Sequence, residues 1–131
     1  MQVFRKVEAG AQVASGRISA TEINTDGDLA LVIPNVTFTP KKIFIIANDA
    51  GSKYYSDYYQ PCRACFIDIE NNECIWWTNY NITANNGITL ITEMPTISYS
   101  GDSITIQGTS SYQDFTLGED ITSEYNYIIL G

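Results

Sequence analysis

The segment that most constrains this chain is 35–48, NVTFTPKKIFIIAN. Its second half, IFIIA at 43–47, is an unbroken run of apolar, β-prone residues between Pro40 and the turn-forming sequence NDAG at 48–51. A short apolar run between such breakers is typical of a β-strand that is buried on both faces. We therefore expect a strand here at the centre of the fold, with core on both sides of it.

The length of 131 residues suits one domain, 1–131, with a single hydrophobic core. Hydrophobic residues make up 44% of the chain, and they are weighted toward Ile, Val, Tyr and Phe, which favour strands over helices. About nine or ten short strands separated by Gly, Asn and Asp indicate an all-β fold. The prediction is a single antiparallel β-sandwich of jelly-roll or Ig-like type, and an open β-barrel is the alternative.

The stretch 17–23 alternates in polarity and predicts one half-exposed strand, preceded by small-residue connecting chain at 10–16. The polar stretch 24–28 then leads into an apolar strand at 29–33. Asn24, Asp26 and Asp28 have the alternate spacing of calcium-loop oxygens, but an EF-hand loop counted from Asn24 would need Gly and Glu where this chain has Leu29 and Asn35. A plain hairpin turn is therefore predicted.

The segment 64–80 reads as a hairpin, with Asn71 and Asn72 as a two-residue loop. In that register Glu70 pairs with Glu73, and counting back gives the pairs Ile67 with Trp76, Phe66 with Trp77 and Cys65 with Thr78. Trp76 and Trp77 then point to opposite faces. One indole should belong to the core and the other should be covered by a second layer, a loop or a partner; the pattern leaves open which is which.

A net charge of −8 argues against nucleic-acid binding, which requires clustered Lys and Arg. No apolar stretch reaches the roughly 18 residues that span a bilayer, so we expect no membrane insertion. The opening sequence MQVFRKVEAG lacks a positive-then-apolar leader, and synthesis in the cytoplasm is expected.

Three cysteines, Cys62, Cys65 and Cys74, are expected to be free thiols. A structural zinc site usually needs four ligands, and the chain has no histidine, so we predict neither a metal nor a cofactor. A redox Cys-x-x-Cys motif begins a helix, whereas the sequence after Cys65, FIDIE, is a strand pattern.

The absence of histidine removes the commonest general base at neutral pH. Carboxylates such as Glu70 and Glu73 could act in hydrolysis, but near a hairpin tip they are solvated and nothing raises their pKa. The chain is therefore predicted not to be an enzyme.

The stretch 49–61, DAGSKYYSDYYQP, has the composition of an adaptable binding loop, although its rings could equally pack over the end of a sheet. Together with the tryptophan pair it gives a candidate partner or ligand surface, comprising Tyr54, Tyr55, Tyr58, Tyr59, Trp76 and Trp77.

Three segments carry a family resemblance: SGRI at 15–18, FTPKKIFII at 38–46 and YNYIILG at 125–131. Together they resemble small β-sandwich domains of tailed-bacteriophage virion proteins, in which SGxF/I, GFxPKxIII and YxYIAxG strands recur in head-decoration, tail, baseplate and fibre components. Two departures stand out. The residues NVT at 35–37 replace the glycine before the Phe, and Ile129-Leu130 replaces Ile-Ala.

The resemblance implies a non-enzymatic structural protein of the virion, a small accessory component on the capsid surface or tail, made in the host cytoplasm. Its implied partners are other virion proteins and copies of itself in a homo-oligomer. The alternative is a carbohydrate-binding or host-receptor-binding adhesin module that stacks exposed Tyr and Trp rings on a host surface glycan.

Overall fold

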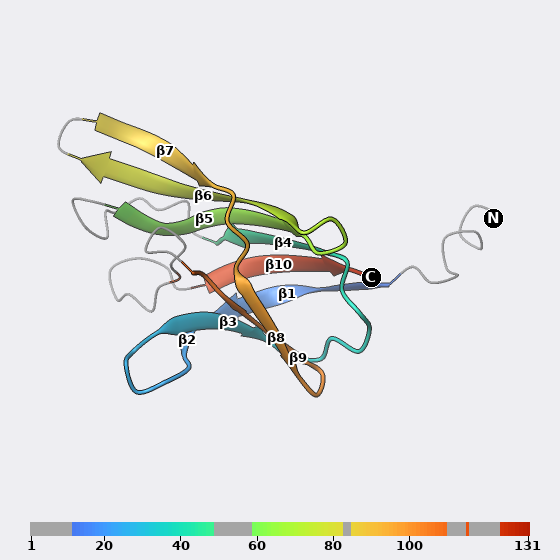
Figure 1. Cartoon of the computed structure of the whole chain (residues 1–131). Helices are drawn as coiled ribbons and strands as arrows, with labels where there is room; N and C mark the ends of the chain where they lie inside the picture. The colour runs from blue at the N-terminus through green and yellow to red at the C-terminus, as the bar shows by residue number, and fades with distance from the viewer. Residues whose placement is uncertain (1–11, 49–58, 83–84, 110–114, 116–123) are drawn as a thin grey trace.

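The fold is an all-β sandwich (Figure 1). The computed structural model describes residues 12–48, 59–82, 85–109, 115 and 124–131. These contain ten strands in two antiparallel sheets, and among them there is neither a helix nor a closed barrel. The predicted antiparallel β-sandwich is thereby confirmed, and the barrel alternative is not.

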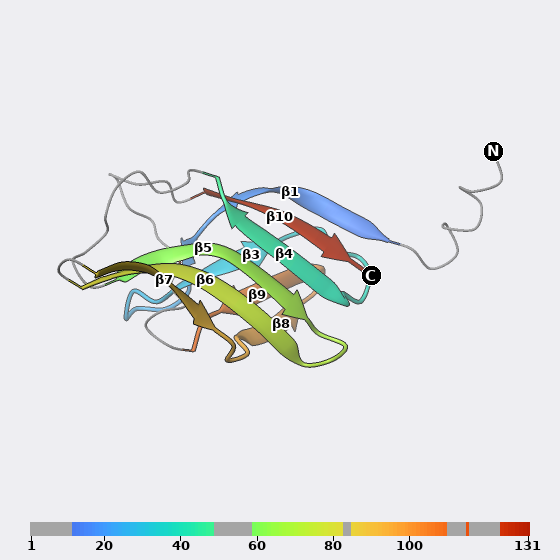
Figure 2. The ribbon, with the colours of Figure 1, turned by 90° about the horizontal axis from the view of Figure 1, so that it is seen from above.

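The larger sheet has six strands, and Figure 2 looks onto it with β3, β8 and β9 behind. Its order is β1 (Val13–Ser19), β10 (Glu124–Leu130), β4 (Lys42–Ala47), β5 (Tyr59–Asp68), β6 (Glu73–Ile82) and β7 (Asn85–Ile91). The smaller sheet has the order β2 (Thr21–Glu22), β3 (Leu29–Ile33), β9 (Ser103–Gln107) and β8 (Thr96–Ser100).

The chain changes sheets at Ala20, which is buried and lies between β1 and β2. The prediction of one strand over 17–23 is therefore wrong, because its first part belongs to the larger sheet and its last part to the smaller. The expected connecting chain at 10–16 already contains the start of β1. A small residue at the crossing lets the backbone turn into the core without displacing other side chains.

The turn between β2 and β3 is the predicted hairpin turn. The Asn24 side-chain oxygen accepts hydrogen bonds from the backbone N–H of Asp26 at 3.0 Å and of Asp28 at 3.2 Å, and its amide donates to the Asp28 carboxylate at 2.8 Å. Gly27 has a φ of 84°, which glycine adopts without steric cost. The polar side chains of this turn therefore satisfy its own backbone.

Strand β4 occupies the interior of the larger sheet, between β10 and β5, as expected for the run 43–47. Its burial alternates, however: Ile43 and Ile45 are fully buried, while Phe44 and Ile46 are exposed. The prediction of a strand buried on both faces is therefore wrong, because the smaller sheet covers only one side of the larger sheet.

The β5–β6 hairpin has a four-residue turn, 69–72, in place of the predicted two-residue loop. The Asp68 carboxylate accepts hydrogen bonds from Asn71, from the backbone N–H at 3.2 Å and from the side-chain amide at 2.8 Å, and Asn72 takes a positive φ of 55°. Asp68 thus pairs with Glu73, and Cys65 faces Trp76 and not Thr78. This two-residue shift preserves face parity, so Trp76 and Trp77 still point to opposite faces.

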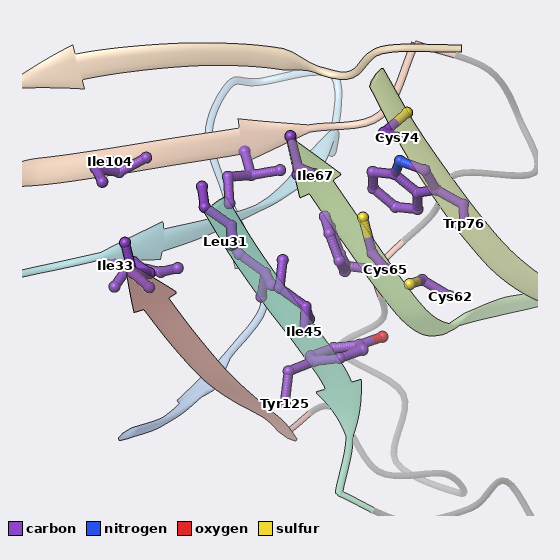
Figure 3. Packing of buried hydrophobic residues seen from close by; sticks show 14 of the residues in the cluster. Leu31, Ile33, Ile45, Cys62, Cys65, Ile67, Cys74, Trp76, Ile104 and Tyr125 are labelled. Carbon is purple, nitrogen blue, oxygen red and sulfur yellow. The ribbon is translucent and has the colours of Figure 1, made fainter. Parts of the chain in front are cut away.

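The core lies between the two sheets (Figure 3). It combines aliphatic side chains from both sheets with a cluster of aromatic side chains. The Trp76 ring lies 5.4 Å from that of Phe115, which meets Tyr125 edge-on at 5.2 Å. Leu31 and Ile33 from β3 and Ile104 and Ile106 from β9 are buried opposite them. Full burial of side chains of this size contributes about 1.5–3 kcal/mol each, which makes this layer the main source of stability.

The three segments that carry the family resemblance lie in one part of the larger sheet, where β10 is inserted between β1 and β4. A Cβ at Gly16 would lie 2.8 Å from the Tyr127 hydroxyl, so this glycine gives the ring its space. A Cβ at Gly131 would collide with the Phe38 ring and lie 3.0 Å from the Thr39 carbonyl oxygen. The glycines and aromatic residues of these segments are therefore fitted to one another across adjacent strands.

We expect Gly131→Ala to lower the free energy of unfolding by about 1–3 kcal/mol, because the added methyl meets both a packed ring and backbone. Gly16→Ala is the matched control, with a smaller loss, because its new methyl meets only the outer end of a tyrosine side chain. Urea denaturation of the two variants measures the difference. Equal losses, or none for Gly131→Ala, would contradict this account of the packing.

Candidate functional site

The structure describes only part of the predicted aromatic surface. Tyr54, Tyr55 and Tyr58 lie outside the described residues. Tyr59 is the first residue of β5, where its backbone pairs with that of Tyr80. The tyrosine loop therefore stays a prediction.

The two tryptophans have opposite environments. Trp76 is fully buried against Phe115, so in the folded chain it belongs to the core and cannot contribute to a partner surface. Trp77 is half-buried and lies on the opposite face of β6, beside Ala64 of β5 and Leu90 of β7. Of the two candidates, only Trp77 remains on the surface.

Trp77 belongs to a continuous apolar area on the face of the larger sheet that points away from the smaller sheet. Strand register aligns its residues in two neighbouring rows. One row is Ile128, Phe44, Phe66 and Ile75, and the other is Ile46, Ala64, Trp77 and Leu90. The Phe44 and Phe66 rings stack at 4.8 Å in the middle of the first row. We call these eight residues the outer apolar face.

Large parts of these side chains are exposed: 58% of Ile46, 56% of Leu90, 47% of Ile128, and 37% each of Phe44 and Ile75. Single exposed apolar residues are common on protein surfaces, but a contiguous area across five strands is typical of surfaces that bind another protein or a ligand. Sequence reasoning missed this surface, because it explained the apolar run 43–47 by burial within one chain. The sequence feature that indicates this surface is the presence of apolar residues at both odd and even positions of β4, β6 and β10.

A third row, at one end of the outer apolar face, is charged. Lys42 Nζ lies 3.0 Å from a Glu70 carboxylate oxygen and 3.9 Å from one of Asp68. The hydrogen bond to Glu70 is the main cause that raises the Lys42 pKa, and the hydrogen bond from the Asn71 amide is the main cause that lowers the Asp68 pKa. Both groups therefore stay ionised at neutral pH and form a polar rim.

A concave region adjoins this rim between β5 and β6. It has a volume of about 360 Å³, and its lining includes Phe66, Ile75, Asp68 and Glu73. The hollow is thus apolar on the side of the outer apolar face and acidic on the side of the rim.

The three cysteines carry free, buried thiols. Burial raises the pKa of all three thiols, and the Cys74 thiol donates a hydrogen bond to the Glu93 carbonyl oxygen at 3.1 Å. A thiol with a raised pKa remains protonated at neutral pH and is a poor nucleophile. The Cys62-x-x-Cys65 motif lies inside β5, in agreement with the expected strand pattern around it.

The described residues contain no group of three or more His, Cys, Asp or Glu side chains arranged to hold a metal ion. Within the same residues, no helix has the length and apolar character needed to cross a membrane.

A second concave region lies at the smaller sheet and the connection before β4. Its volume is about 430 Å³, and its lining includes Phe38, Tyr99, Asp102 and Ser103. Tyr99 on β8 is 57% exposed. We call this region the Tyr99 cleft, because this side chain is its most exposed aromatic group.

Comparisons with protein families, with curated proteins and with solved structures gave no match for this chain.

Proposed function

We propose that this chain is a non-enzymatic structural protein of a tailed-bacteriophage virion, a small accessory component on the capsid surface or tail that assembles through protein–protein contacts. The outer apolar face is the observation that carries this proposal. A sheet face with exposed Phe, Ile and Leu on four of its strands is costly in water and is stabilised when another protein covers it.

The packing of the resembling segments supports the assignment to virion proteins. SGRI, FTPKKIFII and YNYIILG come from distant parts of the chain, yet they belong to β1, β4 and β10, which are neighbours in the larger sheet. Gly16 fits Tyr127, and Gly131 fits Phe38. The segments therefore behave as one structural unit, which is what a recurring set of strand motifs requires.

The charge of the chain is compatible with assembly from free copies. A net charge of −8 keeps separate copies soluble through mutual repulsion until a specific contact forms. The charged rim with Lys42, Asp68 and Glu70 borders the outer apolar face and would give such a contact its orientation.

Mass spectrometry of purified particles of the phage that encodes this chain tests the proposal. We expect the chain in the particles, at a fixed copy number relative to the major capsid or tail-tube protein. Its absence from purified particles, together with its presence in lysates of infected cells, would contradict a structural role in the virion.

The Tyr99 cleft favours a second candidate function, the binding of a surface carbohydrate. An exposed tyrosine ring can stack on a sugar ring, and the lining also holds the Asp102 and Ser103 side chains as hydrogen-bonding groups. The proposed carbohydrate site would then lie at the smaller sheet, away from the outer apolar face.

We expect a glycan array to show binding by the wild-type chain, a loss of about tenfold or more for Tyr99→Ala, and retention for Tyr99→Phe, which keeps the ring. A blank array for the wild-type chain, or unchanged binding by Tyr99→Ala, would contradict the carbohydrate proposal for this cleft.

A further inference from the structure

We propose that a second copy of this chain covers the outer apolar face, in a face-to-face dimer whose two-fold axis runs parallel to the strands between β4 and β5. The inference rests on the proposed function, in which copies of the chain assemble, and it names the surface and the geometry of that assembly. It starts from the alternation in β4, where the residues on both faces are apolar although one chain buries only one face.

The apolar area matches what a stable dimer needs. With roughly 200 Å² for a fully exposed large side chain, the exposed parts of Phe44, Ile46, Ile75, Leu90 and Ile128 amount to about 470 Å² per copy. A standard interface buries about 800 Å² per partner, a little over half of it apolar, or about 450 Å². The exposed apolar area of the outer apolar face therefore matches that of such an interface.

The register of the sheet makes this face self-complementary. A two-fold axis between β4 and β5 exchanges these two strands, and it also exchanges β10 with β6. Phe44 then faces Phe66 of the second copy, and Ile128 faces Ile75 of the second copy. Apolar side chains thus meet apolar side chains along the first row. In the second row Ile46 faces Ala64 of the second copy, and Trp77 faces Asn126 of the second copy. The two sheets pack in the aligned manner, about 10 Å apart.

Shape and charge follow the same symmetry. The hollow lined by Phe66, Ile75, Asp68 and Glu73 lies on the β5–β6 side of the axis, whereas the exposed Ile128 and the basic Lys42 lie on the β10–β4 side. The two-fold therefore brings Ile128 and Lys42 of one copy to the hollow of the other. Lys42 meets the acidic lining of that hollow, so opposite charges face each other at the rim.

An axis perpendicular to the strands through the row of Phe44 and Phe66 would not achieve this match. It would place the charged row, with Lys42, Asp68 and Glu73, against the apolar row that contains Ile46 and Trp77. Burial of these charges against apolar side chains would oppose association. The parallel axis is therefore favoured over this perpendicular one, because it places Lys42 opposite Asp68 of the second copy.

Sedimentation equilibrium of the full chain from about 1 to 500 µM tests the dimer. We expect the wild-type chain to be dimeric, and Ile46→Lys to raise the dissociation constant by about 100-fold or more, because the interface would bury an unpaired ammonium group. Tyr99→Lys is the matched control: Tyr99 is as exposed as Ile46, at 57% against 58%, but lies on the smaller sheet. This variant should dimerise like the wild type.

A wild-type chain that stays monomeric over this range would overturn the inference, as would dimers that persist in a folded Ile46→Lys variant or dissociate equally in Tyr99→Lys. Circular dichroism melting of each variant establishes that it is folded. A chain that is monomeric in solution but present in purified particles would overturn the dimer alone. A chain that dimerises in solution but is absent from purified particles would overturn the virion role alone.

Discussion

A sheet has two faces, and in this protein the four-stranded sheet covers only one face of the six-stranded sheet. The covered face carries Ile43, Ile45, Ile67, Trp76 and Ile129, all fully buried, and it supplies the core. The other face carries Phe44, Ile46 and Ile128 on the same strands. The same backbone pairing therefore positions both the hydrophobic core and the outer apolar face, and the register of one determines that of the other.

The sequence predicted those features that depend on local pattern. The β-sandwich, the interior position of the strand over 43–47 and the turn at 24–28 follow from periodicity and from Asn, Asp and Gly at the turn. The hairpin register was wrong by two residues. Adjacent Asn71 and Asn72 suggested a two-residue loop, but the Asp68 carboxylate caps a four-residue turn through its hydrogen bonds with Asn71. Such side-chain capping competes with dipeptide turn preferences and is not apparent before the register is known.

The candidate site was harder to predict. Alternation shows which residues share a face of a strand, but it does not show which of the two faces points into the core. It placed Trp76 and Trp77 on opposite faces, but only the position of the second sheet decides that Trp76 packs with Phe115 in the core. The change of sheet at Ala20 is likewise a tertiary feature, because a small buried residue has no distinctive local pattern. The run 43–47 did indicate the outer apolar face. Its residues are apolar on both faces of the strand, whereas a single chain buries only one of these faces.

If another copy covers the outer apolar face, Trp77 is a natural reporter of that event. In a Trp76→Phe variant, Trp77 is the single tryptophan. Its fluorescence, measured with acrylamide quenching over a concentration series, tests the dimer directly. We expect the emission to shift to shorter wavelength and the quenching to decrease as the concentration rises and the face becomes covered. Emission and quenching that stay constant from dilute to concentrated solution, in a folded variant, would contradict the dimer.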